Sequence, residues 1–229
     1  MISIAIDGPS GAGKSTIAKM AAERFGFVYV DTGAIYRTIG LAAYRKGIST
    51  KDKKKVLSVL PELVIDLKHN ASGEQRMYLN GEDVSEKIRL PEISMCASDV
   101  SAFPEVRAYL MEMQRDMARR YNVIMDGRDI GTVILPDADL KIFLTASAEE
   151  RARRRYLELT QRGNNVSYEY VLEDMKKRDD QDMNRSAAPL VPADDAVYLD
   201  SSELDRDMTL NAVGKLITER TGSRPLEVE

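Results

Sequence analysis

The chain has 229 residues, of which 43% are hydrophobic and 31% charged, and its formal net charge is −4. This length suits one large domain or one domain with a sizeable insertion, and the acidic balance disfavours a general nucleic-acid binder. The only cysteine, Cys96, excludes an intrachain disulfide, and the only histidine, His69, disfavours a catalytic histidine system. No run is long enough to span a membrane and no signal peptide is visible, so we expect a cytoplasmic protein.

A phosphate-binding motif joins the first predicted strand to the first predicted helix. Residues 2–6 are apolar and rich in β-branched side chains, as in a strand, and residues 16–25 have a helical pattern. The pattern G-x-x-x-x-G-K-[ST] lies between them, in the residues Gly8, Pro9, Ser10, Gly11, Ala12, Gly13, Lys14 and Ser15. Its glycines let backbone N–H groups surround a phosphate at a helix N-terminus. Lys14 is expected to reach the β- and γ-phosphates, and the Ser15 hydroxyl to ligate Mg²⁺.

Strands alternate with helices along most of the remaining chain. We predict further strands over residues 27–30, 122–125, 140–144 and 196–200. We predict helices over about 34–46, 51–60 (capped near Ser49 or Thr50), 91–101, 104–121, from 147 to a break at 163, 167–182 and 203–221. This alternation predicts an α/β fold, a three-layer α/β/α sandwich with a five-stranded parallel sheet. The tail from 223 to 229 is expected to be frayed.

A short antiparallel unit interrupts this alternation at about residues 61–90. Residues 63–68 and 75–79 read as strands separated by a turn over 69–73, and a third strand begins at 82–84. The dipeptide Asn80-Gly81 is typical of a two-residue β-hairpin turn. We therefore predict a small antiparallel β insertion, whose simplest role is structural.

Polar clusters follow two of the predicted parallel strands, where open α/β sheets bind ligands. Residues 31–37 follow the second strand and include Arg37, whereas Asp126, Arg128 and Asp129 follow the third. Asp126 could hold Mg²⁺ or could cap a turn. Arg128 and Arg37 could bind a phosphate through their planar guanidinium groups. Asp129 could pair only with Arg128, or it could accept a hydrogen bond from a base or a ribose.

Arginines also gather on two predicted helices near the end of the chain. Arg178, Asp182 and Arg185 have the spacing i, i+4, i+7 and share one helix face, which is either a ligand-binding face or a solvated face with salt bridges. The preceding helix carries a dense arginine patch at Arg151, Arg153, Arg154 and Arg155. This patch could belong to a mobile lid over phosphates, pair with Glu149, Glu150 and Glu158, or bind nucleic acid. The acidic chain and the lack of interleaved aromatic residues disfavour nucleic acid.

Taken together and in this order, the motifs of the chain resemble those of the bacterial cytidylate kinases, the CMP/dCMP kinases of the nucleoside monophosphate kinase group. The motifs are residues 7–16, 31–37, 126–132, 136–138 and 187–190, and the resemblance extends from residue 2 to about 199. It implies transfer of the γ-phosphoryl group of Mg·ATP to CMP or dCMP by a P-loop kinase. The implied partners are ATP, Mg²⁺ and these small substrates, with no nucleic acid and no membrane, and the implied state is a monomer.

The resemblance also implies a role for each matching residue. The implied ATP site comprises Gly8, Pro9, Ser10, Gly11, Ala12, Gly13, Lys14, Ser15 and Thr16, with the lid arginine Arg154 assisted by Arg151. The implied CMP site comprises Thr32, Ser98, Arg107 and Asp129 at the base, Arg37, Arg128 and Arg185 at the acceptor phosphate, and Arg178 and Asp182 at the ribose and phosphate. Lys14, Arg128 and Arg185 are the implied catalytic residues, and Ser15 and Asp126 the implied metal ligands, Asp126 directly or through water.

The chain departs from the family pattern at a few positions. Thr32 replaces a common serine and keeps the hydroxyl, Ser15 stands where some members have glycine, and Gln181 and Met183 stand where arginine is common. The resemblance divides the chain into a core (1–33, 104–150 and 186–229), an acceptor region (34–103) and a lid (151–185). The alternatives are a GTPase-like switch, for which the chain lacks the guanine-reading motif N-K-x-D, and a kinase for UMP, AMP or another small acceptor.

Overall fold

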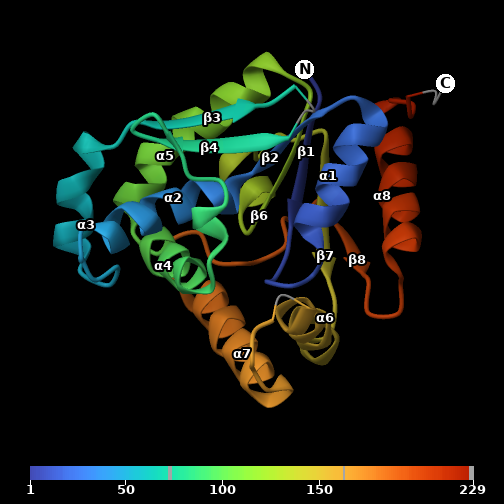
Figure 1. The fold of residues 1–229 in the computed structure, drawn as a ribbon. Coiled ribbons are helices and arrows are strands. Elements are labelled where there is room, and N and C mark those ends of the chain that lie inside the picture. Colours follow the sequence, from blue (N-terminus) through green and yellow to red (C-terminus); the bar gives the residue numbers. More distant parts are fainter. Residues whose placement is uncertain (72–73, 162, 227–229) are drawn as a thin grey trace. The chain divides into compact units, whose positions relative to one another are not determined.

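The structure, a computed structural model, describes residues 1–71, 74–161 and 163–226. It divides into two compact units, one formed by residues 1–29 and 120–229 and the other by residues 30–119. Figure 1 traces both units along the chain. Each unit has its own hydrophobic core, so each is described by itself.

The first unit is organised by a five-stranded sheet with the strand order β2-β6-β1-β7-β8. The strands are β1 (Ser3–Asp7), β2 (Val28–Asp31), β6 (Val123–Gly127), β7 (Leu140–Thr145) and β8 (Val197–Asp200). The pairs β1–β6, β1–β7 and β7–β8 are parallel, and their register places Asp7 beside Gly127 on one side and Phe143 on the other. The predicted α/β fold with a five-stranded parallel sheet is therefore confirmed.

Helices α1 (Lys14–Phe25) and α8 (Arg206–Thr221) lie side by side against this sheet (Figure 1). Their apolar faces, including Ile17 and Ile217, pack on strand residues such as Ile6 in one buried cluster. Full burial of an aliphatic side chain of this size contributes about 1.5–3 kcal/mol, so the cluster holds the strand ends in place. The unit also contains the π-helix η3 (Ile130–Ile134), α6 (Ala148–Gln161) and α7 (Tyr168–Asn184).

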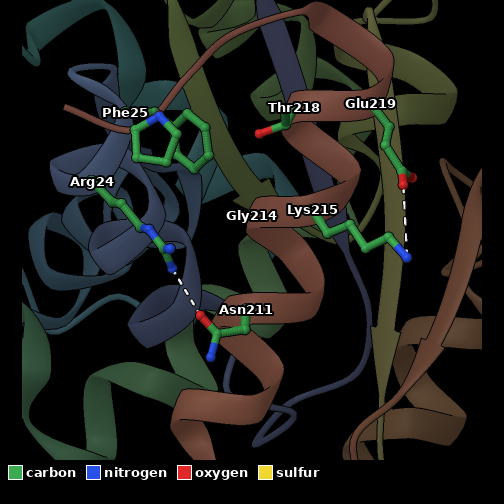
Figure 2. A pocket seen from close by; sticks show the side chains of 8 residues that line it. Arg24, Phe25, Asn211, Gly214, Lys215, Thr218 and Glu219 are labelled. Carbon is green, nitrogen blue, oxygen red and sulfur yellow. Dashed lines mark hydrogen bonds and ion pairs between the residues drawn. The ribbon is translucent and has the colours of Figure 1, made fainter. Parts of the chain in front are cut away.

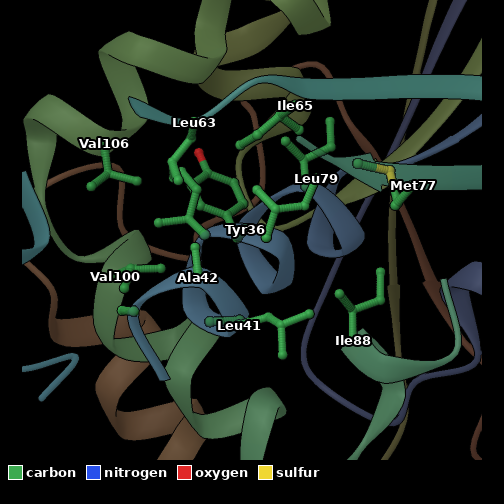
Figure 3. Close-up of a cluster of buried hydrophobic side chains, with 14 of the residues drawn as sticks. Tyr36, Leu41, Ala42, Leu63, Ile65, Met77, Leu79, Ile88, Val100 and Val106 are labelled. Carbon is green, nitrogen blue, oxygen red and sulfur yellow. The ribbon is translucent and has the colours of Figure 1, made fainter. Parts of the chain in front are cut away.

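The second unit combines helices with the predicted antiparallel insertion, here a three-stranded sheet of order β3-β4-β5. Its elements are α2 (Thr32–Arg45), α3 (Lys53–Val59), η1 (Leu60–Glu62), β3 (Ile65–His69), β4 (Gln75–Leu79), β5 (Glu82–Asp83), η2 (Lys87–Arg89), α4 (Pro91–Ser101) and α5 (Pro104–Arg120). Asn80 and Gly81 both have positive φ, as the predicted hairpin turn requires. Figure 3 shows buried side chains of the core of this unit, among them Leu41, Met77 and Val106.

Several predicted boundaries are wrong, and side-chain capping explains two of them. Helix α3 begins after Asp52, whose carboxylate accepts from Lys55 N, rather than after Ser49 or Thr50. Helix α8 begins after Asp205, which accepts from Met208 N, and not at residue 203. Part of the predicted turn over 69–73 and part of the tail lie outside the described residues. In the described part of the tail, Leu226 N donates to Arg24 O at 2.8 Å, so the tail is not frayed at this residue.

Candidate functional site

The phosphate-binding loop joins β1 to α1, as the sequence predicts. Gly8, Gly11 and Gly13 all have positive φ, which brings the backbone into a compact wrap. The Lys14 ammonium is buried in this wrap and donates to Pro9 O at 2.7 Å. Burial, and next the nearby Arg128 charge, lower the pKa of Lys14 to about 7. The loop thus holds a cation that gains a favourable partner when a phosphate arrives.

Asp126 ends β6 and lies against the loop. Its carboxylate accepts hydrogen bonds from Ser15 Oγ and Tyr29 Oη, both at 2.8 Å. Both donors are side-chain hydroxyls, so these two bonds are not those of a turn cap. A hydroxyl and a carboxylate are oxygen donors of the kind that Mg²⁺ prefers, and Mg²⁺ usually keeps waters and phosphate oxygens as its other ligands. The pair therefore fits a magnesium ion, although the described residues contain no group of three or more acidic, His or Cys side chains that could hold a metal without such ligands.

Two ion pairs connect the residues that follow β6 with α7 and with the residue that follows α7. Arg128 Nε donates to Asp182 Oδ2 at 2.7 Å, and Arg185 Nη2 lies 3.4 Å from Asp129 Oδ1. Burial opposes the charges of Arg128 and Asp182, but their mutual attraction raises the pKa of Arg128 and lowers that of Asp182. Asp129 pairs with Arg185, so the interpretation that it pairs only with Arg128 is wrong. The predicted helix face is wrong for Arg185, because α7 ends at Asn184 and Arg185 follows it with extended backbone. The solvated face is wrong as well, since Asp182 is buried. Two arginines are thus held in the unit that contains the phosphate-binding loop.

Helices α6 and α7 also contact the loop directly. Arg151 donates to Asp179 through both terminal nitrogens, at 3.1 and 2.7 Å, and to Ser10 O at 3.0 Å. Arg178 Nη1 donates to Ser10 Oγ at 3.2 Å. Arg154 lies near the loop, about 4.0 Å from the point where a Gly13 Cβ would be. These contacts join the predicted lid helices to the phosphate-binding loop within one unit.

The remaining arginines of the patch on α6 pair with acidic neighbours, as one of the sequence interpretations requires. Arg153 and Arg154 both pair with Glu150, and Arg155 pairs with Glu158. Hydrogen bonds from Arg153, and next from Arg154, lower the pKa of Glu150 to about 2 in spite of partial desolvation. Arg153 and Arg155 therefore belong to a charged surface of α6, whereas Arg154 also donates to Ser201 O at 2.7 Å and lies near the loop.

The sequence-predicted residues of the second unit lie on α2, α4 and α5. Arg37 pairs with Asp31, which caps α2, at 2.7 Å, and Thr32 is buried at the first residue of that helix. Arg107 is buried, with its guanidinium 5.5 Å from the Tyr36 ring centroid. Ser98 Oγ is buried without a hydrogen-bond partner among the described residues. An unpaired buried hydroxyl is costly in a protein interior, so it marks a position where a polar ligand would be stabilised.

Sequence reasoning missed three side chains that support the site. Tyr29 holds Asp126, Asp179 holds Arg151, and Asp7 accepts from two backbone N–H groups of η3, Ile130 N at 2.8 Å and Gly131 N at 2.7 Å. Asp7 carried a signal, because a carboxylate at the end of an apolar strand is as unusual there as Asp126. Tyr29 and Asp179 carried none, since their partners lie 97 and 28 positions away in the chain.

Asp7 predicts a pH dependence of stability. Burial raises the pKa of Asp7 from 3.8 to about 6, and the two backbone hydrogen bonds oppose this shift. The charge of Asp129 raises this pKa further, and the charge of Lys14 lowers it. The folded protein therefore binds the proton of Asp7 more tightly than the unfolded chain does. The free energy of unfolding gained from this protonation is complete below pH 3.8 and is lost as the pH rises through about 6. The unfolding free energy of the wild type minus that of Asp7→Asn should fall by up to about 3 kcal/mol from about pH 4 to about pH 7. Urea unfolding of both proteins across this range measures it, and a constant or rising difference contradicts the expectation.

A surface pocket of about 380 Å³ lies between α1 and α8, at the end of α1 away from the phosphate-binding loop. Figure 2 shows Arg24 directed at Asn211 and Lys215 at Glu219 along its wall. None of the sequence-predicted site residues lines this pocket. Across the described part of the chain, no helix is both long enough and apolar enough to cross a membrane.

Comparisons with known proteins agree with these observations. The family model described as "Cytidylate kinase" matches residues 4–219. A cytidylate kinase from Caldicellulosiruptor bescii is 53% identical over 215 residues, which cover 94% of this chain and 95% of that protein. One from Caldicellulosiruptor saccharolyticus is 51% identical over 222 residues, covering 97% and 98% of the two chains.

One solved structure supports the fold alone. An uncharacterized protein from Eubacterium ventriosum aligns with a TM-score of 0.54 over 96% of this chain and 100% of that chain. Its sequence is 15% identical, so the likeness concerns the arrangement of helices and strands and not the chemistry.

Proposed function

The chain belongs to the cytidylate kinase family, and we propose from its geometry how it transfers a phosphoryl group from ATP to CMP or dCMP. The observation that carries the assignment of roles is the presence of two ion pairs, the partly buried Arg128–Asp182 and the buried Arg185–Asp129. They hold two guanidinium groups in the unit that contains the phosphate-binding loop. A kinase that moves a phosphoryl group between two phosphates needs cations for both.

The loop binds the triphosphate of ATP. Its backbone N–H groups and the N-terminus of α1 surround the phosphates, and Lys14 turns from Pro9 O to the β- and γ-phosphates. Ser15 and Asp126 would hold Mg²⁺, which neutralises the phosphate oxygens when it is bound. Arg154 and Arg151 belong to the nucleotide side, and Arg151 acts there through its bonds to Ser10 O and Asp179.

Arg128 and Arg185 bind the acceptor phosphate, together with Arg37 of the second unit. A phosphate dianion offers these arginines more negative charge than the single carboxylates that they contact in this structure. Arg178 and Asp182 bind the ribose and phosphate. The nucleophile is an ionised phosphate oxygen, so no general base is needed. The side chains contribute position and charge neutralisation, and exclusion of water protects ATP from hydrolysis.

Thr32, Ser98, Arg107 and Asp129 recognise the cytosine base. The unpaired buried hydroxyl of Ser98 supports this role, because a hydrogen bond from a base edge would remove the penalty of its burial. Arg107 is fixed for recognition by Tyr36 and by Ser101 O at 3.3 Å.

We keep the division into a core, an acceptor region (34–103) and a lid (151–185) as part of the proposal. The small hydrophobic cluster of Ala152, Val171 and Met175 joins the two lid helices and supports their movement as one body. Hinged closure of the lid and the acceptor region would exclude water during transfer. A cytoplasmic location and a monomeric state stay predictions from the sequence.

A coupled assay of ADP release with CMP, dCMP, UMP, AMP and GMP tests the proposed function. We expect CMP and dCMP to give the highest kcat/KM and Mg²⁺ to be required. A better turnover with another monophosphate would overturn the base recognition proposed above. GTP hydrolysis without stimulation by any monophosphate would overturn the kinase mechanism in favour of a GTPase-like switch.

Replacing Asp129 by alanine should weaken CMP more than ATP. Asp129 accepts from the base in our proposal and also holds Arg185, so its loss removes one hydrogen bond and loosens one acceptor cation. We expect KM for CMP to rise about 10–100-fold and KM for ATP to change less than about 3-fold. Steady-state kinetics with each substrate varied in turn measures both constants. An equal loss for the two substrates would remove Asp129 from base recognition.

A further inference from the structure

The segment that carries Arg128 and Asp129 continues into the π-helix η3 (Ile130–Ile134). This single wide turn is closed by Ile134 N donating to Asp129 O at 3.2 Å and by Leu135 N donating to Ile130 O at 2.7 Å, and Asp129 O also accepts from Val133 N at 2.9 Å. The first N–H groups of any helix lack partners within the helix. How these groups are held decides where the two preceding side chains lie.

Asp7 supplies the missing acceptors from the neighbouring strand β1. Its Oδ1 accepts from Ile130 N at 2.8 Å and its Oδ2 from Gly131 N at 2.7 Å, so each oxygen holds one N–H group. The side chain is 5% exposed, and its strand pairs with β6 in the register Asp7↔Gly127. A buried carboxylate is expensive unless such donors face it, so its presence indicates that the turn depends on it.

Lys141 on β7 closes the other side of the turn. Its ammonium is tied to Asp195 at 2.8 Å, which draws the aliphatic part of the side chain along Gly131. A Cβ on Gly131 would lie 3.0 Å from Lys141 Cδ and 3.4 Å from Asp7 Oδ2. The turn is therefore enclosed by side chains of the neighbouring strands β1 and β7. A shift of the turn by less than an ångström would meet steric resistance from them.

We propose that Asp7 is a positioning residue for the acceptor nucleotide: it holds the N–H groups of Ile130 and Gly131 and thereby fixes Arg128 and Asp129. The inference rests on the proposed function, in which Arg128 and Asp129 bind CMP. Asp7 touches neither substrate. Its hydrogen bonds go to the acceptor side, to Ile130 N and Gly131 N, whereas Lys14 of the donor half donates to Pro9 O.

Asp7→Asn and Asp7→Ala form a graded test. Asparagine keeps one acceptor and turns an N–H₂ group toward the other backbone donor, whereas alanine leaves both N–H groups unpaired. We expect KM for CMP to rise about 10-fold in Asp7→Asn and about 100-fold in Asp7→Ala. The Kd for ATP should change less than about 2-fold, since the loop keeps its contacts. Amide hydrogen exchange measured by NMR should become faster at Ile130 and Gly131 in both variants.

Asp139→Asn is the matched control. Asp139 contacts the other end of β1 by accepting from Ser3 N at 2.8 Å, so its variant should remove a carboxylate charge beside the same strand without raising KM for CMP. If the Asp7 variants do not fold, Gly131→Ala replaces them, because its Cβ presses on Lys141 and Asp7 and displaces the same turn. It should also raise KM for CMP with ATP binding preserved.

The outcomes separate this inference from the proposed function. Unchanged exchange at Ile130 and Gly131, or faster exchange with unchanged KM for CMP, would overturn the positioning role. Loss of ATP and CMP affinity to the same extent would overturn it as well, because a general structural role predicts that result. If the wild type does not phosphorylate CMP, the proposed function fails, and faster exchange with intact ATP binding still identifies Asp7 as the anchor of the turn.

Discussion

Lys14→Met is expected to lower kcat about a thousand-fold while leaving the Tm unchanged or higher. The ammonium of Lys14 is the cation nearest to the transferred phosphoryl group in the proposed mechanism, and methionine keeps the length of the side chain without the charge. The fold itself disfavours this charge, since burial and then Arg128 lower the pKa of Lys14 to about 7. Activity and stability should therefore change in opposite directions, as at many functional sites.

Lys19→Met provides the control for this experiment. Lys19 is exposed on the same helix, so its replacement removes an equal charge from α1 without touching the loop. Turnover of CMP at saturating ATP and thermal unfolding of the same samples at pH 8 measure both quantities. A Lys14→Met protein that keeps a tenth or more of wild-type turnover would contradict the role of Lys14. A large fall in Tm would instead show that its bond to Pro9 O outweighs the penalty of burying the charge.

Gly8→Ala should destabilise the first unit by at least about 3 kcal/mol and abolish nucleotide binding. Gly8 has φ +149°, and a Cβ at this position would lie 1.9 Å from Leu144 O. The obstacle is the backbone of β7, a buried central strand, so it cannot turn away as a side chain could. The loop would have to leave the sheet edge, which would also displace Lys14.

Gly222→Ala separates the steric clash from backbone strain. Gly222 ends α8 with φ +71°, and nothing lies within 4 Å of its Cβ position. Its variant should lose about 1–2 kcal/mol from the left-handed conformation alone and keep full activity per folded molecule. Urea unfolding and ATP titration of both variants give the comparison. Equal losses of stability would mean that the contact with Leu144 O has no energetic effect.

Local patterns of the sequence predicted most of the fold. The strand-loop-helix context of residues 8–15, the Asn80-Gly81 turn and the apolar strand over 140–144 depend on neighbours in the chain, and the structure has each of them. The π-helix after Asp129 was not predicted. The N–H groups of Ile130 and Gly131 donate to Asp7, and Ile130 lies 123 positions from Asp7 in the chain, so no local pattern could predict this contact.

The choice between alternative interpretations of the candidate site likewise depended on distant partners. Spacing alone placed Arg178, Asp182 and Arg185 on one helix face but allowed either a ligand-binding or a solvated face. The structure pairs Asp182 of α7 with Arg128, and Arg185, which follows the helix, with Asp129, so both side chains meet residues that follow a strand of the same unit. On α6, by contrast, Arg153 and Arg155 pair with Glu150 and Glu158 three positions away on the same helix.

By itself, the sequence determined the phosphate-binding loop, the α/β class and the family. The loop and the α/β class follow from residue types at short spacing, where backbone geometry is set by the residues themselves, and the family follows from the order of five short motifs along the chain. Only the tertiary structure decided what holds the loop and the arginines. Asp126 accepts from Ser15, Asp182 pairs with Arg128, and Asp7 accepts from the first N–H group of the turn that follows Asp129. These contacts join strands and helices that are far apart in the chain. They exist because a parallel sheet places the carboxyl ends of its strands on the same side. The buried carboxylates at these ends are stable only with the hydrogen-bond donors and cations that the fold brings to them.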